Sequence, residues 1–150
     1  MLFNNKKKKD TVTKSKIPVC DISEFYYTCE NINYNASFLR YKFSVNDEKY
    51  VFEYEIREKK GDYGPTDEND IIKKGTYELS NDEKNEFILF LKDGEVSLRK
   101  ASIKTGETGP WMYLYWKNDK GKYQVFNFPS YAMKTEFEKF CTELMNRNND

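Results

Sequence analysis

Apolar and polar residues alternate along residues 37–45 and 48–57, which predicts two strands with one buried and one solvated face. Asn46 and Asp47 separate the two segments, so we expect a hairpin with a two-residue loop. In that register Arg40 lies opposite Glu53 on the solvated face. The pairs expected on the buried face are Phe43 with Tyr50, Tyr41 with Phe52 and Leu39 with Tyr54. A four-residue loop would change these partners and keep the same faces.

Apolar residues recur at helical spacing in two places, residues 81–92 and 130–146. Ser80 and Glu83 have the spacing of a capping box before the first segment, and Gly94 follows it as a helix stop. The residues expected to face inward are Phe87, Phe90 and Leu91 in the first helix, and Met133, Phe137, Phe140, Cys141 and Leu144 in the second.

Shorter apolar segments predict strands at residues 24–30, 75–79, 95–101, 111–116 and 123–128. With the hairpin, the pattern gives about six or seven strands and two amphipathic helices, which is typical of the α+β class. We therefore expect a single domain with a mainly antiparallel, twisted sheet and helices packed on it.

The two predicted helices resemble each other, and each follows a strand. The residues that recur fifty positions later are Ser80, Lys84, Glu86, Phe87 and Phe90, as Ser130, Lys134, Glu136, Phe137 and Phe140. Two interpretations stay open: capped amphipathic helices look alike, or the chain contains two related strand–helix halves.

Charge is distributed unevenly along a chain whose formal net charge is zero. Residues 1–16 contain six Lys and one Asp, so the remaining residues carry an excess of five acidic side chains. We expect residues 1–16 to form a flexible basic tail, residues 17–146 the folded domain, and residues 147–150 a frayed terminus. An acidic domain argues against a nucleic acid partner.

The composition indicates a core built from large rings. Hydrophobic residues make up only 38% of the chain and charged residues 33%, but there are 12 Tyr, 11 Phe and 2 Trp. Each ring buries about 150–250 Å², so a few rings can replace many aliphatic side chains. Chains rich in aromatic residues are not typical of wholly disordered proteins.

Several kinds of catalytic chemistry are excluded by the sequence. There is no His, which removes Ser-His-Asp and Cys-His catalysis, and no glycine-rich phosphate loop. The three Cys (Cys20, Cys29 and Cys141) lack metal-binding spacing, so we expect reduced thiols in a cytoplasmic protein. We interpret the acidic residues Asp62, Asp67, Glu68 and Asp70 as a solvated loop, and expect no metal and no cofactor.

The segment 111–116 is the one feature that exceeds the needs of a sheet with one buried face, because both of its faces are apolar. Trp111, Tyr113 and Tyr115 point to one side, and Met112, Leu114 and Trp116 to the other. A four-residue turn would place Gln124, Phe126 and Phe128 with the first set. We predict that Trp111, Tyr113 and Tyr115 contact a partner, since strand ends beside loops often carry binding residues. A central strand pair buried on both sides is the alternative.

The absence of catalytic motifs and the aromatic sheet favour a small, non-enzymatic module that binds another protein. One alternative is a sheet face that stacks a sugar or a nucleobase. A second alternative is an enzyme that uses carboxylates without His. No segment has the length of a membrane span, so we expect no membrane insertion. The oligomeric state and the biological process do not follow from the sequence.

Overall fold

The computed structural model describes residues 15–16, 22–97, 110–116 and 124–147. These residues form one antiparallel sheet of eight strands, in the order β1-β6-β8-β7-β2-β3-β4-β5. The strands are β1 (Ser15–Lys16), β2 (Ile22–Asn31), β3 (Ser37–Asn46), β4 (Lys49–Glu58), β5 (Ile71–Glu78), β6 (Glu95–Ser97), β7 (Trp111–Trp116) and β8 (Gln124–Asn127). The helices are α1 (Asn81–Leu91) and α2 (Tyr131–Arg147), and a 3₁₀ turn, η2, spans Glu68–Asp70. The predicted α+β class is confirmed.

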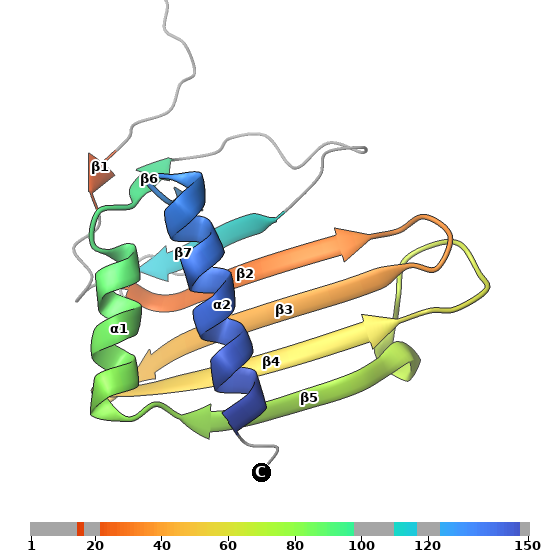
Figure 1. Cartoon of the computed structure of the whole chain (residues 1–150), viewed down its shortest axis with the longest axis horizontal. Helices are drawn as coiled ribbons and strands as arrows, with labels where there is room; N and C mark the ends of the chain where they lie inside the picture. The colour runs from red at the N-terminus through yellow and green to blue at the C-terminus, as the bar shows by residue number, and fades with distance from the viewer. Residues whose placement is uncertain (1–14, 17–21, 98–109, 117–123, 148–150) are drawn as a thin grey trace, which may run out of the picture.

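Both helices pack on the same face of the sheet (Figure 1). The long strands β2 to β5 form a meander, and α1 leads from the edge strand β5 back to β6 at the other side. In the second half β8 lies between β6 and β7, so the two halves differ in strand order. Within the described residues, the two halves share a capped helix that follows a strand.

The predicted extent of the tail can be compared with the structure only at residues 15–16, and otherwise it stays a prediction. Ser15 and Lys16, which we assigned to the tail, pair with β6 as the short strand β1. Residues 1–14 lie outside the described part of the chain. At the other end α2 includes Arg147, which we had placed in the frayed terminus, and residues 148–150 are not described.

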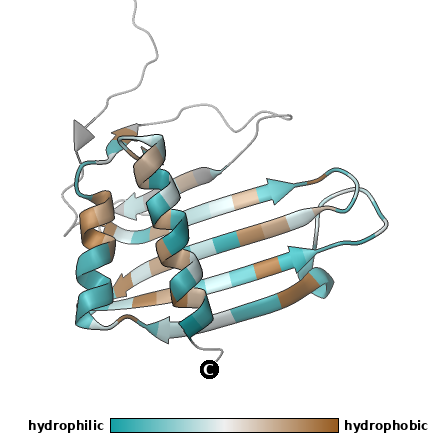
Figure 2. Cartoon of the chain, viewed as in Figure 1, coloured by the Kyte–Doolittle hydropathy of each residue, from teal (hydrophilic) through white to brown (hydrophobic). Residues whose placement is uncertain are grey.

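The central hairpin has the predicted faces but a different register. Its turn is Asp47-Glu48, with Asn46 paired to Lys49, so the predicted partners were wrong by two residues. Both turn residues have positive φ, 52° and 67°, which is the geometry of a type I′ hairpin turn. Figure 2 shows hydrophilic and hydrophobic residues alternating along β3 and β4. A shift of the pairing by two residues keeps every side chain on the same face of the sheet. The predicted faces were therefore correct although the predicted partners were not.

The register of the β7–β8 hairpin also corrects the prediction. Tyr113 pairs with Val125 and Leu114 with Gln124, so Phe126 does not share a face with Tyr113. Phe126 is instead fully buried on the helix side of the sheet, with its ring centroid 5.2 Å from that of Phe25. Burial of this large ring decides which residues of β8 face inward.

Aromatic rings fill the space between the sheet and the helices. The ring of Phe137 in α2 lies at the centre, and Phe43 of β3 stacks on Phe87 of α1 with centroids 4.1 Å apart. The rings with centroids 5.0–6.4 Å from that of Phe137 are Phe25, Tyr27, Phe43, Phe87, Phe90, Phe128 and Phe140. Tilted and edge-on pairs of this kind add about 0.5–1.5 kcal/mol each to the burial term.

Tyrosine hydroxyls fix α2 to the strands beneath it. Tyr27 of β2 donates a hydrogen bond to the Glu138 carboxylate, and Tyr77 of β5 donates to the backbone carbonyl of Leu144. The Arg147 guanidinium lies 4.4 Å from the centroid of the Tyr77 ring and pairs with Glu83 at the start of α1. The last turn of α2 therefore contacts both the edge strand and the other helix.

The predicted capping box of α1 is confirmed. The backbone N–H of Glu83 donates to Ser80 Oγ, and the backbone N–H of Ser80 donates to the Glu83 carboxylate at 2.8 Å. Gly94 follows the helix as predicted, but its role is packing against the core. A Cβ atom at this buried position would lie 1.9 Å from an atom of the Phe126 ring.

We predict that Gly94→Ala lowers the free energy of unfolding by about 1–3 kcal/mol or more, the usual cost of overpacking. The reason is the contact with Phe126, whose ring is itself enclosed. Chemical denaturation measures the loss. Adding Phe126→Leu should restore part of the stability in the double variant, whereas additive effects of the two substitutions would contradict the proposed clash.

We predict that the free energy of unfolding falls as the pH rises above 10. Burial raises the pKa values of Tyr27, Tyr41 and Tyr77 above the ordinary value of 10.0, that of Tyr77 to about 12. Well below pH 10 these phenols are protonated in both states. Above it the unfolded chain releases protons that the folded chain retains, so stability is lost with rising pH.

Urea denaturation at pH 9 and pH 11 tests this dependence. In Tyr77→Phe the decrease should be smaller, because one of the shifted phenols is absent. Tyr63→Phe is the matched control for the loss of one tyrosine hydroxyl, since Tyr63 is 70% exposed. An equal decrease in the wild type and in Tyr77→Phe would show that this residue does not contribute.

Candidate functional site

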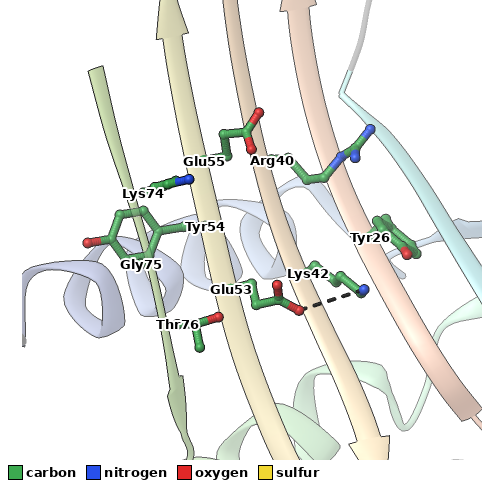
Figure 3. A pocket seen from close by; sticks show the side chains of 9 residues that line it. All are labelled: Tyr26, Arg40, Lys42, Glu53, Tyr54, Glu55, Lys74, Gly75 and Thr76. Atoms are coloured by element: carbon green, nitrogen blue, oxygen red, sulfur yellow. Dashed lines mark ion pairs between the residues drawn. The ribbon is translucent and has the colours of Figure 1, made fainter. Parts of the chain in front are cut away.

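The side of the sheet opposite the helices, here called the helix-free face, carries the candidate site (Figures 1 and 3). Strand alternation and the observed registers place polar and aromatic side chains of five strands on it. From β7 to β5 they are Tyr113 and Tyr115, then Glu24, Tyr26 and Thr28, then Arg40 and Lys42, then Glu53 and Glu55, then Lys74 and Thr76. The face thus has an aromatic band beside bands of basic and acidic residues.

Tyr26 is the centre of this face. Tyr113 lies directly opposite it on β7, and the Tyr115 ring meets it edge-on with centroids 5.8 Å apart. On its other side the Arg40 guanidinium and the Lys42 ammonium lie 5.5 and 5.6 Å from its ring centroid. Burial raises the pKa of Tyr26, although the charge of Lys42 opposes this shift. The ring is therefore held neutral between two tyrosines and two cations.

The charged residues next to Tyr26 form a network. Lys42 Nζ lies 3.3 Å from a Glu24 carboxylate oxygen. It also lies 3.6 Å from a carboxylate oxygen of Glu53, the ion pair that the dashed line marks in Figure 3. Burial lowers the pKa of Lys42, but its net shift is upward because Tyr26, Glu53 and Glu24 favour the charged amine. Glu55 pairs with Arg57 at 2.6 Å. Glu53 and Glu55, the acidic side chains of β4 on this face, are thus both engaged by cations.

Among the described residues, Arg40 contacts aromatic rings rather than carboxylates. Its guanidinium lies 5.1 Å from the Phe38 ring centroid, and Arg57 approaches the same ring at 4.8 Å. Phe38 is only 8% exposed although it lies on the helix-free face. Two guanidinium groups therefore cover an aromatic ring outside the main core.

An open depression of about 560 Å³ lies over β2 to β5 on this face. Arg40, Lys42, Glu53, Glu55 and Lys74 provide its charged lining, and Tyr26 forms one side (Figure 3). At the β5 side the absence of a side chain on Gly75 makes room for the Tyr54 ring, which a Cβ atom would approach to 2.7 Å. The depression is a shallow, charged surface rather than an enclosed cavity.

The structure describes two of the three residues that we predicted to contact a partner. Tyr113 and Tyr115 are half-buried on the helix-free face, and Met112 is 7% exposed within the core. The backbone of Trp111 pairs with Thr28, but its side chain lies outside the described part of the structure, as do those of Leu114 and Trp116. Contact of this face with a partner stays a prediction.

Sequence reasoning missed that Tyr26 belongs to the site. Its position became evident only from the pairing of β2 with β7, which are distant in the sequence. Thr28 was missed for the same reason. It is 6% exposed, and its hydroxyl has no hydrogen-bond partner among the described residues. The sequence pattern that could have identified them is the alternation along β2. Glu24, Tyr26 and Thr28 alternate with the buried Phe25 and Tyr27, and so lie on the other face of the sheet.

The acidic loop has a structural use. Asp67 caps the 3₁₀ turn η2, Asp70 accepts a hydrogen bond from the Asp67 backbone N–H, and Lys59 pairs with Asp70 at 3.7 Å. Within the described ranges no three His, Cys, Asp or Glu residues are grouped as metal ligands. Cys29 and Cys141 are free thiols, and burial raises the pKa of both; Cys20 lies outside the description.

Neither described helix is long and apolar enough to cross a membrane. Comparison of the chain with protein-family models, with curated proteins and with solved structures finds no match in any of the three. The geometry of the helix-free face is therefore the basis for assigning a function.

Proposed function

We propose that this chain is a small, non-enzymatic module that binds another protein through its helix-free face. The observation that carries the proposal is the contiguous group of Tyr26, Tyr113, Tyr115 and Arg40 on a face that neither described helix covers. Tyr and Arg are the residue types that most often dominate the binding energy of protein interfaces. Trp111, by its place in β7, would extend this group.

The charge pattern supports a protein partner. Basic side chains of β3 lie between the acidic side chains of β2 and β4, so the face presents both signs over a short distance. Such patterns contribute to specificity and to association rate more than to affinity. A long polyanion would meet the carboxylates of Glu24, Glu53 and Glu55, which makes nucleic acid a poor fit for this surface.

The shape of the face also favours a protein over a small ligand. Small-molecule sites enclose about 70–90% of the ligand surface. The depression beside Tyr26 is open, and three of its charged lining residues, Lys42, Glu53 and Glu55, already take part in the ion pairs Lys42–Glu53 and Arg57–Glu55. A partner that covers this face would exclude water from these pairs.

The two free thiols, Cys29 and Cys141, suit the cytoplasmic location that we propose with this function.

Site-specific photo-crosslinking in the cells that make the protein tests the proposal. A benzophenone amino acid replaces Tyr113 in one variant and Leu89 in the control. Leu89 is a 61% exposed residue of α1 on the opposite side of the molecule. We expect a protein adduct of defined mass at position 113 and none of that mass at position 89. The absence of any protein adduct at 113, or the same adducts at both positions, would contradict the proposal.

Once the partner is isolated, substitution measures which residues carry the binding. Arg40→Ala should weaken binding by about tenfold or more, because Arg40 contacts the Tyr26 and Phe38 rings at the centre of the face. Lys92→Ala, at the exposed end of α1, is the matched control for loss of one positive charge.

A further inference from the structure

A second exposed surface lies at the end of the sheet away from the helices (Figure 1). We call it the tip; it consists of residues 30–36 and 58–70, the two connections β2–β3 and β4–β5 with their flanking residues. Three large apolar side chains are exposed there: Ile32 and Tyr34 by 50% each, and Tyr63 by 70%. The ring centroids of Tyr34 and Tyr63 lie 5.0 Å apart. Exposed apolar groups gathered in this way are typical of interaction sites.

Hydrogen bonds between the two connections hold these side chains in place. Asn35 N–H donates to the Asp62 carbonyl at 3.0 Å, and Gly64 N–H donates to the Ile32 carbonyl at 3.1 Å. Gly61 N–H donates to the side chain of Asn35 at 2.8 Å. Because the loops are bound to each other, the rings are presented without a further loss of backbone freedom on binding.

The tip is strongly acidic. Its charged residues are six carboxylates (Glu30, Glu58, Asp62, Asp67, Glu68 and Asp70) and two amines (Lys59 and Lys60). Its net charge is therefore −4, which is most of the −5 carried by all residues after the tail. Lys59 already pairs with Asp70. An apolar centre with an acidic rim fits a segment that combines apolar anchors with several positive charges.

The chain itself contains such a segment at its start. Residues 1–3 are Met, Leu and Phe, and residues 6–9 are four consecutive Lys. We propose that residues 1–9 of one copy bind the tip of a second copy. The apolar residues contact Tyr63, Tyr34 and Ile32, and the lysines lie against the acidic rim.

The position of β1 bears on whether the tail contacts the tip of its own copy or that of a second copy. Ser15 pairs with Val96, and the registers from β6 to β2 place it level with Tyr27. Ile32 is then five residues along and four strands across, about 25 Å away in a flat sheet, and Tyr63 lies farther still. Lys9 is six residues before Ser15 and reaches at most about 21 Å, and Lys6 is nine residues before it and reaches at most about 32 Å. A contact within one copy therefore needs an extended segment that crosses four strands. β1 also runs toward the tip, so the preceding segment starts on the side away from it. A second copy sets no such limit on the segment, so we assign the contact to two copies.

This contact joins two different surfaces and leaves a free tip and a free tail on the resulting pair. Such a heterologous contact propagates into open chains, unless two copies exchange their tails and close into a dimer. It also depends on ionic strength, because exposed charges are screened over about 8–10 Å at physiological salt. The proposal is independent of the helix-free face.

Sedimentation velocity with two complementary variants of the full chain tests the proposal. The tail variant carries Gln in place of Lys6, Lys7, Lys8 and Lys9. The tip variant carries Asp62→Asn and Tyr63→Ser, which keep the turn's hydrogen-bonding capacity and remove the exposed ring. The control is Tyr131→Ser, which removes a ring of similar exposure, 78%, from the start of α2. Equal melting temperatures establish that all variants are folded.

At low salt the wild type and the control should associate with increasing concentration, and added salt should reverse this. Each complementary variant alone should associate at least tenfold more weakly. An equimolar mixture of the two should form dimers and nothing larger, because only one contact is available. A monomeric wild type at low salt, or a mixture that associates no more than its components, would overturn the proposal. An equal loss of association in the Tyr131→Ser control would also overturn it.

Discussion

The packing of Phe137 into a layer of aromatic rings is the interaction on which the rest of this structure depends. Its ring contacts those of seven other residues, from β2, β3, α1, α2 and the segment after β8. Loss of a buried Phe side chain costs about 3–5 kcal/mol, a large part of the 5–15 kcal/mol that stabilises a typical domain. Both helices must lie on this face, since their apolar residues have no other ring layer to cover.

This arrangement leaves two surfaces without a covering helix, and they differ in chemistry. The helix-free face combines Tyr26 and its neighbours with ion pairs of both signs. The tip combines exposed rings with an excess of carboxylates. Ion pairs near the surface typically contribute about 0–1 kcal/mol to folding, so the charge pattern of either surface adds little to stability. The aromatic residues on both surfaces are the groups that recognition would use.

The elements and faces of this fold follow from local patterns, whereas the registers do not. Alternation along β3 and β4, the capping box at Ser80 and the helical spacing around Phe137 are properties of short segments, and all were correct. The turn at Asp47-Glu48 was missed because neither residue is the Gly that a type I′ turn prefers. Phe126 was assigned to the wrong face because its burial depends on Gly94 and Phe25, which are distant in sequence. The same limitation concealed Tyr26, the centre of the candidate site.

The helices cover the Met112 side of β7 and leave the tyrosine side open, and this arrangement can be measured in solution. Hydroxyl-radical footprinting of the folded chain, normalised to the chain in urea, tests it most directly. Methionine is readily oxidised, so exposure would be evident at once. The structure predicts strong protection of Met112 and clearly weaker protection of Tyr113 and Tyr115. Oxidation of Met112 at the rate of the unfolded chain, with both tyrosines protected, would show that the helices lie on the opposite face.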